Sequence, residues 1–179
     1  ETARVVGDVL VEFTPDGTVM NEYRLLDLLD QRRVCYGSRA GYWVRRGFPG
    51  TCDWSHVNGL AYDAANNQII ASVRHQDCMI AINRENGGLE WILGNPGNWN
   101  EPWSQKLLKP SDGLEWQFHQ HDCSVTTSGT IMCFDNGNHR ALPFDKKMAG
   151  ADCYSRAVEF SVDTKNRSVE QIWSRGLRE

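Results

Sequence analysis

The sequence has no long hydrophobic run and few cysteines, and each shortage excludes a class of protein. Its apolar stretches, such as QIIASV, are far shorter than the ~18 residues of a membrane-spanning helix. Cysteine supplies 6 of 179 residues, below the ~8 to 10% of a disulfide-built scaffold, and no CxxC pair indicates a zinc site. The net charge of -4 leaves no basic stripe for nucleic acid or an anionic membrane surface.

What remains is an ordinary globular composition, with 40% hydrophobic and 23% charged residues. The length of 179 residues fits one domain or a part of one. The chain opens at Glu1 without a positively charged and apolar leader. We therefore expect its beginning to be a processing product or the edge of a fragment.

Turn-forming residues divide the sequence into short strands. The stretches at 14–18, 63–68, 126–130 and 163–168 each join two runs of strand character, which predicts a succession of β-hairpins. One stretch, Tyr23–Arg33, places leucines among Asp and Arg and predicts a short surface helix centred on 25–31. No other segment has a helical pattern, so we expect an all-β fold.

The hairpins repeat along the chain. Residues 55–76 align with 120–139, so that His56 matches His121, and Trp91 matches Trp173 in the segments that follow. Tandem four-stranded antiparallel units are the blades of a β-propeller, and about two and a half are present where a closed ring needs roughly four to eight. We therefore expect a partial propeller, completed by missing sequence or another chain. Its expected parts are a partial blade and connecting helix at 1–34, a loop at 35–54, a blade at 55–94, a connection at 95–118 and a blade at 119–174.

Strand register predicts which side chains meet at the mouth of the channel. The first strand of each blade lines the channel, so His56 and His121 should converge there. Pairing across the 63–68 turn sets His75 opposite His56 and returns Arg74 to the same end, and pairing across 126–130 sets Asn136 opposite His121. The predicted cluster contains His56, Asn58, Arg74, His121 and, as a further candidate, Asn136.

Register also bears on the cysteines. It places Cys123 and Cys133 on opposite faces of the sheet, where they cannot bond, although a bulge at Gly129 would reverse this. Cys35 and Cys52 bracket a loop rich in Gly, Arg and aromatic residues that has no strand pattern. We expect these two to form a disulfide.

Two histidines and an arginine suit an oxyanion better than a metal ion. Metal sites built on His commonly add carboxylates or thiolates, and only Asp53 and Asp122 lie near in the sequence. Arg offers a planar fork to sulfate or phosphate oxygens, and a neutral imidazole can attack sulfur or phosphorus. The pattern predicts group transfer through histidine, without a metal or other cofactor.

The segments DWSHVNGLAYD, SVRHQ, QHDC, FDNGNHR and YSRAVEF, over roughly residues 50 to 175, resemble the bacterial arylsulfate sulfotransferases. The resemblance implies a six-bladed propeller that moves a sulfuryl group from a phenolic sulfate to an acceptor phenol without a nucleotide donor. It implies that His121 forms a transient sulfohistidine while His56, Asn58 and Arg74 hold the sulfuryl oxygens. It also implies a periplasmic or secreted protein. A further active-site His of the family belongs to an earlier blade and has no counterpart here.

The same residues also admit structural interpretations. His56 and His121 can be buried histidines that bond the backbone, and Arg74 can belong to a salt bridge in the channel. The alternative function is a non-catalytic propeller that serves as a binding or assembly platform. Assembly into a homo-oligomer is a further alternative. The residues assigned to structure or solvent are His75, His119 and His139, while the tryptophans Trp99, Trp103 and Trp116 are either aryl-stacking groups or loop plugs.

Overall fold

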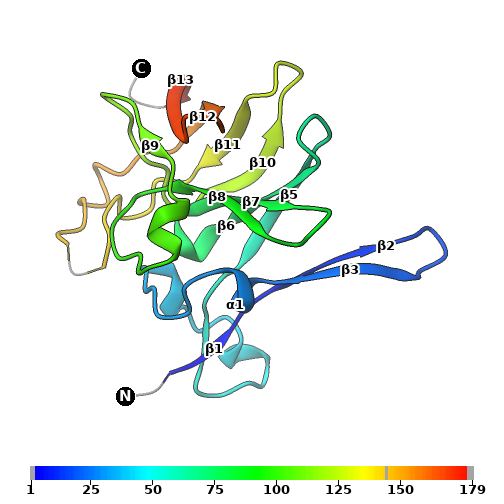
Figure 1. The fold of residues 1–179 in the computed structure, drawn as a ribbon. Helices are drawn as coiled ribbons and strands as arrows, with labels where there is room; N and C mark the ends of the chain where they lie inside the picture. Colours follow the sequence, from blue (N-terminus) through cyan, green and yellow to red (C-terminus); the bar gives the residue numbers. More distant parts are fainter. Residues whose placement is uncertain (1–2, 144, 177–179) are drawn as a thin grey trace.

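The computed structural model describes residues 3–143 and 145–176, whose strands form four sheets, none of them closed (Figure 1). The four-stranded sheet is antiparallel, and each strand pairs with the next along the chain. Its strands are β5 (Val57–Asp63), β6 (Gln68–Val73), β7 (Cys78–Asn83) and β8 (Leu89–Gly94). The five-stranded sheet has the order β10 (His121–Val125), β11 (Ile131–Asp135), β12 (Arg156–Asp163), β13 (Ser168–Gly176) and β9 (Lys109–Pro110).

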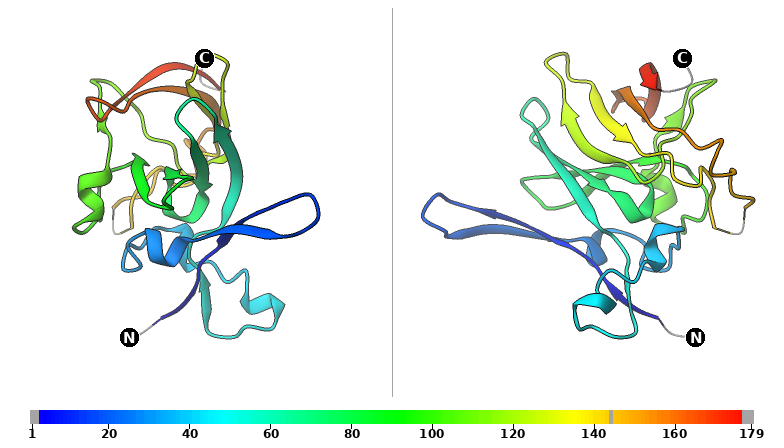
Figure 2. Two further views of the ribbon diagram at one scale, coloured as in Figure 1. Left: turned by 45° about the vertical axis from the view of Figure 1, so that its right-hand side comes forward. Right: turned by 180° about the vertical axis from the view of Figure 1, so that it is seen from behind.

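The N-terminal part of the chain forms two small sheets. β1 (Arg4–Val6) pairs in parallel with β4 (Thr51–Asp53), which the sequence did not predict. β2 (Val9–Phe13) and β3 (Val19–Arg24) form a hairpin that extends away from the other strands in both views of Figure 2. All four predicted turns join strands, so the succession of hairpins is confirmed.

Helix is scarce, and the one predicted helix is shorter than expected. α1 spans only Leu25–Leu28, because Leu29 turns to an extended conformation and the buried Asp30 carboxylate bonds Asn100 Nδ2 at 2.7 Å. None of the helices in the described ranges is long and apolar enough to cross a membrane. Four 3-10 turns were not predicted: η1 (Gly37–Arg39), η2 (Val44–Arg46), η3 (Arg74–Gln76) and η4 (Trp103–Lys106).

In the four-stranded sheet, β6 and β7 are buried on both faces, which explains why they are almost continuously apolar. Alternate residues of these strands enter two different cores. Ile70 and Met79 pack with residues of β10 to β13, whereas Ala71 and Ile80 pack with residues of β3, α1 and the segment before β5. Each sheet therefore supports its neighbour, and neither core belongs to one sheet alone.

The two larger sheets meet along β5 and β10. A Cβ atom on Gly59 would lie 2.8 Å from the main-chain nitrogen of Cys123, so only glycine permits this approach. Because β5 begins just after His56 and β10 begins at His121, the contact brings the two predicted site segments to one region.

The outer strands of the two sheets are linked by the residues that lead into and include β9. Leu107 bridges Ile92 of β8, and Leu108 N donates to the Ile92 carbonyl at 2.9 Å. Further on, β9 pairs in parallel with β13, and Ser111 N donates to the Val169 carbonyl at 2.9 Å. We name residues 107–111 the edge clasp.

The turn before β11 corrects the predicted cysteine register. Thr126 N donates to Thr130 O at 2.9 Å and Gly129 has φ +81°, so the turn holds one residue more than the predicted pairing allowed. Cys123 and Cys133 therefore share one core instead of pointing to opposite faces. Both are free thiols.

The expected bond between Cys35 and Cys52 is also wrong, since both cysteines carry free thiols. Cys35 is fully buried, and its Sγ accepts a hydrogen bond from Arg33 Nη1 at 2.8 Å. Cys52 lies in β4, which β1 and not a disulfide holds in place. The cysteines therefore give no support to an exported protein.

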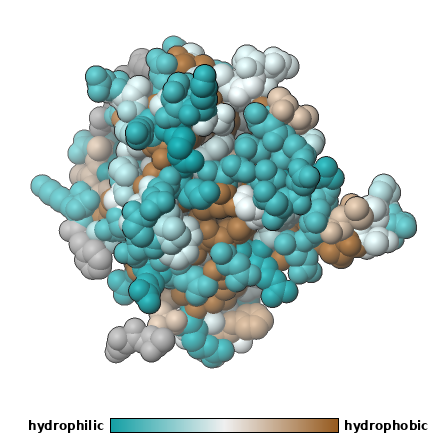
Figure 3. Space-filling model, in the orientation of Figure 1, coloured by the Kyte–Doolittle hydropathy of each residue, from teal (hydrophilic) through white to brown (hydrophobic). Residues whose placement is uncertain are grey.

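The projecting hairpin carries a group of exposed apolar side chains. Hydrophobic and polar surface alternate along this hairpin at the right of Figure 3. Phe13 is 64% exposed, more than the other large apolar residues that are described as exposed. The remaining members of this patch are Val9, Val11, Val19 and Met20.

Candidate functional site

His121 is held by the side chain that the sequence placed beside it. Its Nδ1 lies 2.7 Å from the amide oxygen of Asn136, and an amide oxygen can only accept a hydrogen bond. The proton of the neutral ring is therefore on Nδ1, which leaves the lone pair on Nε2. Strand pairing sets Phe134 opposite His121, so the predicted register is shifted while the predicted contact with Asn136 is present.

His56 also has its Nδ1 in a hydrogen bond, but here the acceptor is a carboxylate. Its Nδ1 lies 2.5 Å from Oδ2 of Asp53, which comes three residues earlier at the end of β4. Burial acts to raise the pKa of Asp53, but the hydrogen bond and the charges of His56 and His75 outweigh it, so this pKa lies below its ordinary value. The ionised carboxylate accepts from Nδ1–H, and Nε2 of His56 is left for another contact.

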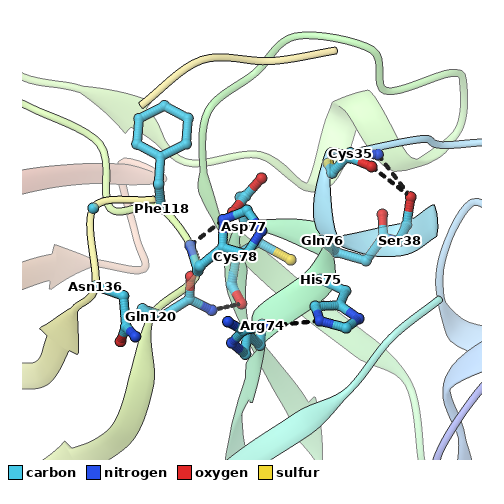
Figure 4. A network of polar contacts seen from close by, with 12 residues as sticks. Cys35, Ser38, Arg74, His75, Gln76, Asp77, Cys78, Phe118, Gln120 and Asn136 are labelled. Carbon is cyan, nitrogen blue, oxygen red and sulfur yellow. Dashed lines mark hydrogen bonds and ion pairs between the residues drawn. The ribbon is translucent and has the colours of Figure 1, made fainter. Parts of the chain in front are cut away.

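Arg74 reaches the His56 end of the hairpin, as predicted. A bulge between Val57 and Gly59 shifts the predicted register by one residue, so Arg74 N, not His75 N, donates to the His56 carbonyl. Burial lowers the pKa of the Arg74 guanidinium, which Asp77 and Asp53 partly oppose. The guanidinium is half-buried, and its side chain contacts His75 (Figure 4).

The fourth predicted residue, Asn58, links the two sheets. Its Nδ2 donates to the main-chain carbonyl of Gln120 at 3.0 Å, directly before His121, while its buried Oδ1 has no hydrogen-bond partner among residues 3–143 and 145–176. Gln120 is itself fixed, because its Nε2 donates to the Cys78 carbonyl at 2.7 Å (Figure 4). Asn58 thus supports the backbone that carries His121.

Two buried aspartates that sequence reasoning missed anchor the approach to His121. Phe118 N donates to Asp135 Oδ1 at 2.9 Å, and His119 N donates to Asp77 Oδ1 at 2.7 Å (Figure 4). Both carboxylates are fully buried, although each stands in a polar stretch of sequence that indicates a surface turn. Their backbone partners, Phe118 and His119, lie 17 and 42 residues away along the chain, so no local sequence pattern indicated that these carboxylates are buried.

Left-handed backbone gathers around these residues. His56, Asp77, His119 and Asp122 have φ between +49° and +55°, which is unfavourable for residues with a Cβ atom. Such conformations persist where the surroundings hold them, and they cluster at functional sites. The hydrogen bonds to Asp53, Asp77 and Asp135 supply that restraint.

Asp53, His56 and His75 lie close enough to hold a metal ion, with one ligand atom of each within 4.8 Å of the others. However, Nδ1 of His75 lies 2.6 Å from the Asp53 carbonyl, and Nε2 lies 2.6 Å from Arg74 Nη1. A guanidinium only donates, so both ring nitrogens of His75 are engaged and neither offers a lone pair. This donor set fits a hydrogen-bond network better than a metal site.

The other histidines lie in a row with His56, and three tryptophans pack against the hydrophobic cores. His56, His75, His119 and His139 form a row of rings with successive centroids 4.5, 6.2 and 6.0 Å apart. The three tryptophans pack against the cores rather than lining an open funnel: Trp99 and Trp103 against one, Trp116 against the other.

Comparison with known proteins agrees with the sequence motifs. The family described as Arylsulfotransferase (ASST) matches the whole chain, residues 1–179. The chain belongs to the arylsulfotransferase family. It is 35% identical over 146 residues to proteins named arylsulfate sulfotransferase AssT from Escherichia coli O6:H1 and from Lelliottia amnigena. The aligned region covers 69% of this chain and 23% of each relative, so the chain spans less than a quarter of their length.

Proposed function

We propose that the protein is an arylsulfate sulfotransferase that uses His121 as its nucleophile. The observation that carries this proposal is the bond from His121 Nδ1 to Asn136, which leaves the Nε2 lone pair for attack. Family membership and the names of the two relatives support the same activity.

In the first half of the proposed reaction, Nε2 of His121 forms a bond to the sulfur of a phenolic sulfate. The bond from sulfur to the aryl oxygen breaks, and the phenolate leaves with the electron pair. Charge accumulates on the oxygens during this step. The donors proposed to stabilise it are Arg74 and the doubly protonated form of His56, which donates from Nδ1 to the Asp53 carboxylate and from Nε2 to the oxygens. In the resulting sulfohistidine the proton stays on Nδ1, which still donates to the amide oxygen of Asn136.

In the second half, the oxygen of an acceptor phenol attacks the sulfur, and the proton of the phenol hydroxyl is transferred to solvent. The nitrogen–sulfur bond breaks and returns neutral His121. The two steps form a ping-pong cycle with a phenolic sulfate donor, a phenol acceptor and no cofactor.

The test compares three forms of the full natural chain with 4-nitrophenyl sulfate and a phenol. His121→Asn should abolish release of nitrophenolate and labelling of the protein with a sulfuryl group. His139→Asn, at the far end of the histidine row, is the matched control and should keep both. Near-native turnover by His121→Asn would refute the mechanism. An inactive wild type that stays bound to other chains would favour the platform function instead.

We also propose that β5–β8 and β10–β13 are successive blades of a propeller, within the units 1–34, 35–54, 55–94, 95–118 and 119–174. The side-by-side packing of β5 and β10 supports this arrangement, and the exposed hairpin β2–β3 fits the outer half of an incomplete blade. A structure of the full natural chain tests it, since a ring that does not close around β5 and β10 would contradict it.

Export to the periplasm or outside the cell is a proposal that rests on the family resemblance alone. Cell fractionation of a strain that expresses the full natural chain tests it. Recovery with a cytoplasmic marker enzyme would contradict it.

A further inference from the structure

The sequence analysis assigned His75 to structure or solvent, and in the structure it contacts the guanidinium of Arg74. Its Nδ1 is 2.6 Å from the Asp53 carbonyl oxygen, which can only accept, so this nitrogen carries the proton. Its Nε2 is 2.6 Å from Arg74 Nη1, which can only donate, so this nitrogen carries the lone pair. The two contacts fix both the tautomer and the orientation of the ring.

The bond to His75 is the one hydrogen bond that the Arg74 guanidinium makes within the part of the chain that is described, and no carboxylate there forms an ion pair with it. A guanidinium has five N–H donors. Its remaining donors are therefore available to an oxyanion, while a single acceptor sets the direction of the side chain.

The ring of His75 is itself immobile. It is 3% exposed and stacks on His56 with centroids 4.5 Å apart. A Cβ on Gly37 would lie 2.6 Å from its Cδ2, so η1 packs directly against the ring. Because of burial, above all, the pKa of His75 falls to about 4, which keeps the ring neutral and able to accept near neutral pH.

We infer that His75 is a positioning residue, which holds the guanidinium of Arg74 beside His56 by a hydrogen bond anchored on the Asp53 carbonyl. This role rests on the proposed function, because it concerns the same oxyanion site. A purely structural histidine would need its bond to Asp53 but would not need an acceptor for Arg74.

The experiment is a double-mutant cycle on the full natural chain with 4-nitrophenyl sulfate. His75→Phe preserves a buried planar ring and removes the acceptor, and it should lower kcat on the order of 10- to 100-fold with a smaller effect on KM. His75→Gln can donate and accept at similar positions, so it should recover most of the loss. The destabilisation control is Asp30→Asn, which disturbs a buried bond to Asn100 and should leave kcat unchanged.

The decisive comparison is made in the Arg74→Ala background. If His75 acts through Arg74, adding His75→Phe to Arg74→Ala should cause no further loss of kcat/KM. An equal loss in both backgrounds would overturn the inference, because His75 would then act without Arg74.

A second measurement does not depend on turnover. In nitrogen-15 NMR spectra the wild type should show His75 as the neutral Nδ1–H tautomer, and Arg74→Ala should shift the Nε2 resonance toward that of a free lone pair. An unchanged resonance would overturn the inference. If the wild type turns over no aryl sulfate, the proposed function fails while this measurement still decides the role of His75.

Discussion

The buried Asp135 carboxylate accepts four hydrogen bonds, and its replacement gives the sharpest stability prediction. It is fully buried, and its Oδ2 accepts from Arg140 at 2.8 Å and from Arg156 at 2.9 Å. Its Oδ1 accepts from the backbone of Phe118 and Gly137, both at 2.9 Å. Asp135→Asn keeps the shape but removes the carboxylate charge that these two buried guanidinium groups share.

Removing one partner of a buried ion pair costs about 3 to 5 kcal/mol. We take the lower end, because Arg156 keeps a second carboxylate, Glu115, at 2.9 Å. A loss of about 3 kcal/mol corresponds to a fall in Tm of roughly 6 to 12 °C for a domain of this size. Glu115→Gln is the matched control: the Glu115 side chain is 59% exposed, so its loss should cost at most about 1 kcal/mol.

Thermal and urea unfolding followed by circular dichroism measure both variants on the same chain. A loss below about 1 kcal/mol for Asp135→Asn, or an equal loss for Glu115→Gln, would refute the assignment of Asp135 as the anchor. In the full natural chain, Asp135→Asn should also slow aryl sulfate turnover, because Phe118 lies on the segment that positions His121.

Three further predictions concern the interior. The lowered pKa of His75, about 4, means that the unfolded chain takes up this proton first on acidification; the free energy of unfolding should fall between about pH 6.5 and 4 by about 3 kcal/mol, and urea unfolding should show a flatter profile for His75→Gln. Gly37→Ala should destabilise the protein by about 1 to 3 kcal/mol, because its Cβ would lie 2.6 Å from the His75 ring, whereas Gly150→Ala meets nothing within 4 Å and should be neutral in the same melting assay. Non-reducing peptide mass spectrometry should find Cys35 and Cys52 unlinked, and a linked peptide pair would contradict the structure.

The parts of the fold that depend on neighbouring residues could be predicted from the sequence. Turn residues and short apolar runs located four hairpins, and the hairpin geometry brought Arg74 back to His56. The bulge at Asn58 and the extra residue in the turn that contains Gly129 each shifted the register by one residue, and a further irregularity lies between His121 and Ser124. No local pattern marks where an extra residue enters a strand or a turn. The contact between His121 and Asn136 is present although strand pairing sets Phe134, two residues earlier, opposite His121.

The parts that depend on distant residues could not be predicted. The parallel pairing of β1 with β4 joins segments far apart in the chain, and α1 ends early because the segment after it is tied to Asn100. Asp77 and Asp135 sit in polar sequence typical of exposed turns, so their burial follows only from the chain segment that crosses them. The partners of His75 could not be predicted for the same reason, since they include the end of β4.

The edge clasp has a consequence for association between molecules. An outer strand with unpaired N–H and C=O groups is a template for a strand of another molecule. Residues 107–111 occupy part of this template on two sheets at once, since they bond Ile92 of β8 and Val169 of β13. A proteolytic cut inside the clasp would therefore expose two unpaired strand edges on a single molecule. A molecule with two such edges can form open-ended polymers instead of dimers.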